Sequence, residues 1–204
     1  MEFRYSQEFK RFVGGEKRLS AIVAGAGAGH EKFRTYARTR FFISRAITQA
    51  GTILDIGCAN GFLMRCLQEW SGHKLVPYGV DRDPALIRQA RALFPGRAEN
   101  FVAADLVDEP DISKIWPRRR FDYIYWNVWD NYAFGPESRV ELLGPCFRRL
   151  RHGGRLILGF YESDKNKTEK MKYLVDLGFT RSLRNPYHRD HGEVIVWKDA
   201  GVDC

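Results

Sequence analysis

The 204-residue sequence has no apolar run approaching the roughly 18 residues that a transmembrane helix needs. Charged residues recur throughout Met1–Phe12, so this segment lacks the apolar core of a secretory signal peptide. These absences predict a cytoplasmic protein without a membrane partner. Internal repeats and low-complexity linkers are also missing, and with 44% hydrophobic residues the chain suits one domain, residues 1–204.

Cysteine is scarce, and its spacing is uninformative. Cys58, Cys66, Cys146 and Cys204 form no C-x-x-C pair. We therefore expect reduced thiols, and neither a disulfide scaffold nor a zinc site.

The most informative stretch is Thr52–Gly61, which reads T-I-L-D-I-G-C-A-N-G. Its apolar start predicts a buried strand, and Gly57 and Gly61 bracket a turn. Apolar residues then recur at helical spacing over Phe62–Trp70. A strand, glycine turn and helix in this order places backbone N–H groups beside a cofactor at the end of an open parallel sheet.

Asp55, within this stretch, argues against a dinucleotide. A carboxylate two residues before Gly57 would repel a pyrophosphate and favours a cationic ligand. The G-x-G-x-x-G fingerprint also fails, because Ala59 and Phe62 stand where its second and third glycines belong. A nicotinamide oxidoreductase is therefore disfavoured.

The D-I-G-C-A-N-G motif resembles the first motif of the class I S-adenosylmethionine-dependent methyltransferases, an acidic residue followed by G-x-x-x-G after a hydrophobic strand. The resemblance covers Ile53 to Lys198. It implies an α/β fold with a Rossmann-like, doubly wound seven-stranded sheet, mostly parallel, with one antiparallel strand near the C-terminus. It also implies a helical N-terminal lid over residues 1–48, with the core at 49–204. The glycine-rich residues 24–30 suit a hinge for such a lid.

Acidic residues end three successive predicted strands, at Asp55, Asp81 and Asp105. Asp81 follows Gly61 by 20 residues, the interval at which nucleotide-binding sheets place a carboxylate on ribose hydroxyls. In the resembled family, the position of Asp105 recognises the adenine amino group. The resemblance thus implies S-adenosylmethionine as cofactor and S-adenosylhomocysteine as product. The cofactor-binding residues that it implies are Asp55, Gly57, Cys58, Gly61, Phe62, Asp81, Arg82, Asp105, Leu106 and Asn127.

The loop after the fourth predicted strand, residues 126–134, reads W-N-V-W-D-N-Y-A-F. In the resembled family, this loop faces the transferred methyl group. It departs here from the N/D-P-P-Y/F pattern of enzymes that methylate exocyclic amines and amides. Its rings can line a flat pocket or flank a cation, or simply cover the sheet edge. We predict a substrate pocket from Trp126, Trp129, Tyr132, Phe134 and the lid residue Tyr36, and Arg34 and Arg40 are further candidate lid contacts.

A general base is needed only if the acceptor is a hydroxyl or a protonated amine. The candidate catalytic residues are Asp130, Tyr132 and His188, with His191 as a further histidine. The segment H-R-D-H-G-E around the histidines also resembles a metal site, but a turn between the last two strands explains it. Asp130 and Asn131 lack the further acids of a metal-dependent enzyme. We therefore predict no metal.

The net charge of +8 suits a nucleic acid, an anionic substrate or a solvated surface. The basic clusters Arg118–Arg120 and Arg148–Arg151 precede predicted strands, at the sheet end away from the glycine turn. The favoured function is therefore methyl transfer to a small-molecule acceptor by a monomer or homodimer. The alternatives are an RNA or protein methyltransferase, and a non-catalytic scaffold that binds the cofactor.

Overall fold

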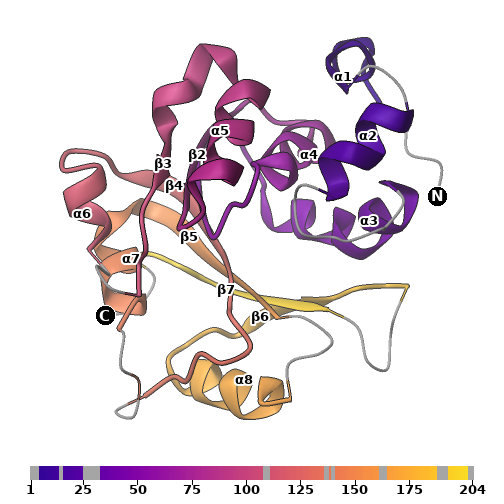
Figure 1. Cartoon of the computed structure of the whole chain (residues 1–204). Coiled ribbons are helices and arrows are strands. Elements are labelled where there is room, and N and C mark those ends of the chain that lie inside the picture. The colour runs from indigo at the N-terminus through magenta and orange to yellow at the C-terminus, as the bar shows by residue number, and fades with distance from the viewer. Residues whose placement is uncertain are drawn as a thin grey trace.

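The computed structural model describes residues 5–13, 16–24, 33–107, 111–135, 138, 141–160, 165–187 and 193–201. These residues form a seven-stranded sheet in the order β3-β2-β1-β4-β5-β7-β6 (Figure 1). The strands are β1 (Gly51–Ile56), β2 (Leu75–Asp81), β3 (Phe101–Ala103), β4 (Phe121–Asn127), β5 (Leu150–Phe160), β6 (Arg181–Arg184) and β7 (Val194–Asp199). Neighbours from β3 to β5 are parallel, whereas β7 is antiparallel to β5 and β6. The predicted mostly parallel sheet with one reversed strand is confirmed.

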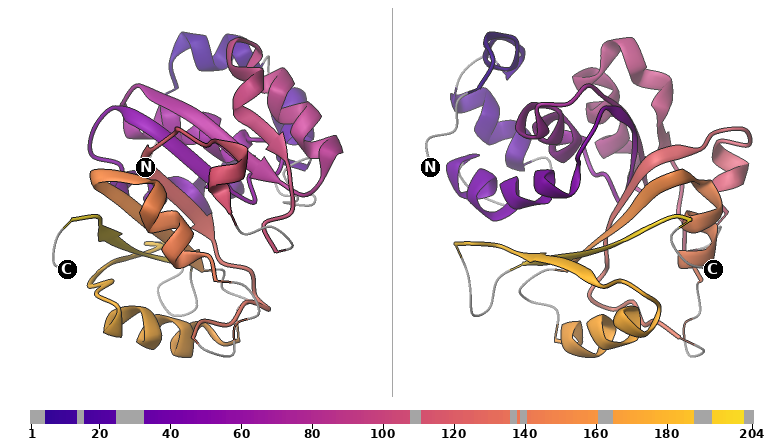
Figure 2. Two further views of the ribbon diagram at one scale, coloured as in Figure 1. Left: turned by 90° about the vertical axis from the view of Figure 1, so that its left-hand side faces the viewer. Right: turned by 180° about the vertical axis from the view of Figure 1, so that it is seen from behind.

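Helices cover both faces of this sheet (Figure 2). They are α1 (Gln7–Val13), α2 (Glu16–Val23), α3 (Phe33–Arg40), η2 (Phe41–Ala46), α4 (Phe62–Ser71), α5 (Pro84–Leu93), η3 (Pro95–Asn100), α6 (Ile112–Ile115), α7 (Leu143–Arg149) and α8 (Lys167–Asp176). The first three helices pack with α4 and α5 on one face, and α6, α7 and α8 pack on the other. N-terminal helices are therefore present as predicted, although most of the predicted glycine hinge lies outside the described residues. No described helix has the length and apolar character to cross a membrane.

The period-two alternation of β4 assigns its side chains to these two faces. Tyr123 and Tyr125 belong to the core cluster on the α4 face, whereas Ile124 and Trp126 belong to the cluster on the α7 face. Asn127 continues the first series and lies on the α4 side. Adjacent residues of this strand therefore pack on opposite faces of the sheet.

The strand order reverses direction between β1 and β4. From β1 the chain passes to β2 and β3 on one side, and β4 and β5 then build the other side. In open α/β sheets, such a switch point leaves a crevice outside the carboxyl ends of the two strands. Because β7 is antiparallel, its first residue Val194 pairs with Phe160, the last residue of β5, and so lies at the same edge.

Local sequence explains where the two helices beside this crevice begin. Gly61 precedes α4 with φ 75°, and the N–H of Phe62 donates to Oδ1 of Asn60 at 3.2 Å. Asp83 caps α5, its side chain accepting from the N–H of Ala85 at 2.7 Å, with proline at the first helical position. Both helices therefore start at the carboxyl ends of the parallel strands.

Candidate functional site

The glycine turn between β1 and α4 is fixed to the neighbouring strand β2. The N–H of Gly57 donates to the carbonyl of Val80 at 2.8 Å, and that of Ala59 donates to Oδ2 of Asp81 at 2.8 Å. Gly57 and Gly61 have φ 74° and 75°. Glycine adopts this left-handed conformation without the steric penalty of a side chain. The conformation of the turn at the crevice is thus fixed by hydrogen bonds to β2, one of them to the carboxylate of Asp81.

Two cavities open at this edge of the sheet and share Gly57. The α3 cavity, of about 300 Å³, is lined by Tyr36, Arg40, Phe42, Ile43, Asp55, Gly57, Cys58, Ala59, Leu63, Tyr125, Asn127, Gly159, Phe160, Glu193, Val194 and Ile195. The β3 cavity, of about 270 Å³, is lined by Ile56, Gly57, Val80, Asp81, Arg82, Ala104, Asp105, Leu106, Val107, Trp129 and Asn131. The turn that the sequence singled out therefore contributes to the lining of both cavities.

The three strand-end acids divide between these cavities. Asp55 is 3% exposed in the α3 cavity, and burial, reinforced by the negative charge of Asp81, raises the pKa of its carboxyl well above the usual range. Asp81 and Asp105 line the β3 cavity. Oδ1 of Asp81 accepts from the N–H of Asp83 at 2.9 Å, and Oδ1 of Asp105 accepts from the N–H of Val107 at 2.8 Å. These bonds fix both carboxylates at the cavity wall.

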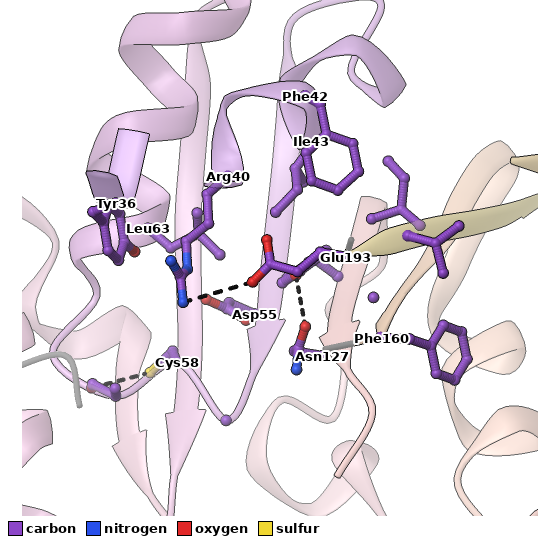
Figure 3. A pocket seen from close by; sticks show the side chains of 16 residues that line it. Tyr36, Arg40, Phe42, Ile43, Asp55, Cys58, Leu63, Asn127, Phe160 and Glu193 are labelled. Carbon is purple, nitrogen blue, oxygen red and sulfur yellow. Dashed lines mark hydrogen bonds and ion pairs between the residues drawn. The ribbon is translucent and has the colours of Figure 1, made fainter. Parts of the chain in front are cut away.

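Asn127 adds an amide to the α3 cavity from the end of β4 (Figure 3). Its Oδ1 accepts from the hydroxyl of Tyr125 at 3.2 Å. Its Nδ2 is buried and has no hydrogen-bond partner among the described residues. A buried donor without an acceptor costs about 1–3 kcal/mol, which a ligand oxygen at this position would offset.

An ion pair stands across the same cavity. Nη2 of Arg40, from the end of α3, lies 3.9 Å from Oε1 of Glu193, which immediately precedes β7. The guanidinium carbon of Arg40 is also 4.4 Å from the ring centroid of Tyr36. Figure 3 shows the Arg40 head group between Tyr36 and Glu193. Sequence reasoning named Arg40 only as a lid contact and missed Glu193, because no local motif marks it.

The aromatic residues predicted for the substrate pocket do not gather in one place. Tyr36 lines the α3 cavity and Trp129 lines the β3 cavity. Trp126 is fully buried in the core on the α7 face, with Tyr132 and Phe134 in edge-on contact at ring-centroid distances of 4.7 and 6.2 Å. None of these last three residues lines either cavity.

The candidate catalytic residues also lie away from the cavities or outside the described chain. Asp130 is exposed, and its carbonyl accepts from Nζ of Lys170 at 3.0 Å. Tyr132 is buried in the core, where burial raises the pKa of its hydroxyl. His188 and His191 lie outside the described residues. Across the described ranges, no group of three or more His, Cys, Asp or Glu side chains could hold a metal.

The remaining predicted cofactor contacts fall into two groups. Cys58 lines the α3 cavity, where burial raises its thiol pKa, and Arg82 and Leu106 line the β3 cavity. Gly61 and Phe62 line neither cavity. Gly61 instead packs against α5, since a Cβ there would meet Cβ of Ala90 at 3.2 Å.

Comparison with known proteins places the motif region in one family. The family model described as "Methyltransferase domain" matches residues 53–154, half of the chain. This match runs from within β1 to the start of β5 and includes the glycine turn and the three strand-end acids. No curated protein matches the chain.

Solved structures share the fold at low sequence identity. A TehB-like S-adenosylmethionine-dependent methyltransferase from Corynebacterium glutamicum is 23% identical, with a TM-score of 0.57 over 91% of this chain and 96% of that one. A chain of the Haloferax volcanii complex that contains the Trm112 methyltransferase activator is 15% identical, with a TM-score of 0.60 over 98% and 99%. An rRNA methylase from Streptococcus thermophilus is 14% identical, with a TM-score of 0.52 over 83% and 97%. At these identities the likeness establishes the fold alone.

Proposed function

Because the chain belongs to the class I S-adenosylmethionine-dependent methyltransferases, we propose that it methylates a small-molecule acceptor at the two cavities that share Gly57. Its cofactor is S-adenosylmethionine, which supplies a methyl group on a positively charged sulfur. Methyl transfer is an in-line displacement, and holding the reacting groups in line contributes about 7–11 kcal/mol to such reactions. The task of the protein is therefore chiefly to bind and orient.

The β3 cavity suits the adenosine portion of the cofactor. Asp81 and Asp105 present carboxylates for the ribose hydroxyls and the adenine amino group, while Ile56, Val80 and Leu106 supply apolar wall for a flat ring. Each oxygen of Asp81 accepts one backbone N–H and keeps capacity for a second donor. Polar groups on one side and apolar groups on the other match the two kinds of surface on a nucleoside.

The α3 cavity suits the methionine portion and the acceptor. The buried carboxyl of Asp55 faces the α3 cavity, so a cation bound there would favour its ionised form. Nδ2 of Asn127 offers a donor at the end of β4, next to the shared Gly57. We assign binding and orientation to these groups, and we assign the adjoining surface of Gly159, Phe160 and Val194 to the acceptor.

The position of the basic residues supports a small acceptor over a nucleic acid. Once Asp55, Asp81 and Asp105 are assigned to the cofactor, the charged residues left among the described lining are Arg40, Arg82 and Glu193. A polyanion requires a larger group of basic side chains around an active-site mouth. The exposed cluster Arg118–Arg120 instead lies at the amino end of β4, the far end of the sheet. This placement of the basic cluster away from the cleft carries the proposal.

A transfer assay tests the acceptor class. Wild-type protein is incubated with S-adenosylmethionine labelled in its methyl group and with separate pools of phenols, carboxylates, amines and thiols, beside total RNA and a protein extract. We expect label in a small-molecule pool and its loss in Asp81→Ala. Asp176→Ala, which removes an exposed acid at the end of α8, is the matched control and should retain transfer. Label in RNA or protein alone would overturn the proposal.

A further inference from the structure

The charged groups of the α3 cavity do not all have a role in the proposed function. Asp55 comes from β1, Arg40 from α3, and Glu193 from the residue before β7. The Arg40 and Glu193 side chains are each 17% exposed, and their closest nitrogen and oxygen are 3.9 Å apart. A tight charge-assisted hydrogen bond measures about 2.7–2.9 Å. The two side chains are therefore farther apart than in a direct hydrogen-bonded ion pair, and they border the space where a ligand would lie.

Arg40 is held in this position from several sides. Its Nη1 donates to Oγ1 of Thr39 at 2.7 Å, and its guanidinium lies over the ring of Tyr36. The carbonyl of Thr39 accepts from Nδ2 of Asn185, which is fully buried at the end of β6. The end of α3 is thus attached to the β6–β7 edge of the sheet, and Arg40 is presented at the cavity in a defined direction.

The amino-acid end of S-adenosylmethionine carries both an ammonium and a carboxylate. Asp55 supplies a carboxyl for the ammonium, but the ligand carboxylate requires a cation. Among the described residues that line the α3 cavity, Arg40 is the only cationic side chain. Its planar guanidinium has five N–H donors in the fork geometry that matches a carboxylate.

Resting on the proposed function, we propose that Arg40 binds the carboxylate of the cofactor's amino-acid end, in competition with Glu193. The ligand carboxylate and Glu193 are like charges that share one guanidinium. The two residues should therefore have opposite effects on cofactor affinity, which is not expected of an ion pair that only supports the fold. Removing Arg40 should weaken cofactor binding, whereas neutralising Glu193 should strengthen it.

Calorimetric titration with two ligands tests this assignment. S-adenosylhomocysteine carries the amino-acid end, and 5′-methylthioadenosine lacks it but keeps the adenosine and the sulfur. The proteins are wild type, Arg40→Gln, Glu193→Gln and the control Arg38→Gln, an exposed arginine of the same helix that lines neither cavity. Thermal unfolding of each variant verifies that it is folded at the titration temperature.

The expected result is selective for the longer ligand. Arg40→Gln should weaken the binding of S-adenosylhomocysteine by about tenfold to a hundredfold, the effect of losing a hydrogen bond to a charged group. It should change the affinity for 5′-methylthioadenosine by less than about twofold. Glu193→Gln should tighten the binding of S-adenosylhomocysteine by about threefold to tenfold, because a nearby like charge is removed. Arg38→Gln should behave as wild type.

Three outcomes would overturn the inference. Unchanged affinity of Arg40→Gln for S-adenosylhomocysteine would show that Arg40 does not contact the ligand. Equal weakening of both ligands would show that Arg40 acts through the fold of the cavity, and weakening by Glu193→Gln would show that the pair supports the site as a unit. Failure of the wild-type protein to bind either ligand would overturn the cofactor placement itself. This result differs from failure of the Arg40 assignment alone, in which the wild-type protein still binds both ligands.

Discussion

Replacing Asp81 by alanine is expected to lower both the stability of the protein and its affinity for S-adenosylhomocysteine. The carboxylate has two structural bonds, from the N–H of Ala59 at 2.8 Å and from the N–H of Asp83 at 2.9 Å. The first of these holds the glycine turn, in which Ala59 itself has a positive φ of 48°. Asp81 also lines the β3 cavity, where we place the ribose hydroxyls.

The two effects have separate magnitudes. A donor left without its acceptor costs about 1–3 kcal/mol when buried, and because Asp81 is partly exposed we expect about 2 kcal/mol for both bonds together. In a protein of 204 residues this lowers Tm by about 4–8 °C. Loss of the bonds to the ligand should cost a further 1.5–3 kcal/mol of binding free energy, or about 10-fold to 150-fold in Kd.

Thermal unfolding and calorimetric titration at a temperature well below both transitions separate these effects. The matched control is Asp83→Ala, which removes the N-cap of α5 at a cost of about 1 kcal/mol but touches neither cavity. The control should melt earlier and bind normally. An Asp81→Ala protein that binds as tightly as wild type would refute the placement of Asp81, and an equal loss of affinity in Asp83→Ala would show that binding follows stability.

Three further outcomes are expected. The pKa of Asp55 is raised in the folded protein, so its contribution to stability is present at low pH and is lost as pH rises from about 4 through the folded-state pKa. Asp55→Asn should remove this loss of stability, as measured by urea unfolding from pH 5 to 8 without cofactor. Parallel pH profiles of the wild type and the variant would contradict this expectation. Gly61→Ala should cost about 2–5 kcal/mol, from left-handed strain and from crowding against Ala90, and an unchanged urea midpoint would show that the turn relaxes. Trp126→Ala should cost about 3–5 kcal/mol of unfolding free energy in urea, with affinity for S-adenosylhomocysteine retained by the folded protein; selective loss of affinity would return Trp126 to the site.

The glycine turn and the three acids near it were predictable because their signals are local. A short apolar run, two glycines and a helical stripe lie in one continuous stretch, and the acids occur where each strand ends. Parallel strands bring their carboxyl ends to one edge, so Asp55, Asp81 and Asp105 meet there without any long-range information. The family resemblance predicted a mostly parallel seven-stranded sheet with one antiparallel strand near the C-terminus, which the structure confirms.

The aromatic loop was harder to interpret because composition does not say which face a ring occupies. Alternation along β4 places Asn127 on the α4 side and Trp126 on the α7 side, and the rings of Tyr132 and Phe134 then pack on Trp126. A loop rich in aromatic residues therefore contributes mainly to the core. Of its predicted pocket residues, Trp129 lines a cavity.

The sequence by itself determined the strand, glycine turn and helix and the acids at the strand ends, because periodicity and strand ends depend on neighbours in the chain, and its resemblance to a known family implied the rest of the sheet. Only the tertiary structure brought Arg40 and Glu193 together across the α3 cavity. Arg40 ends a helix that precedes the first strand, and Glu193 stands before the last strand. They meet because β7 is antiparallel and starts where β5 ends, a pairing that depends on the packing of the whole sheet.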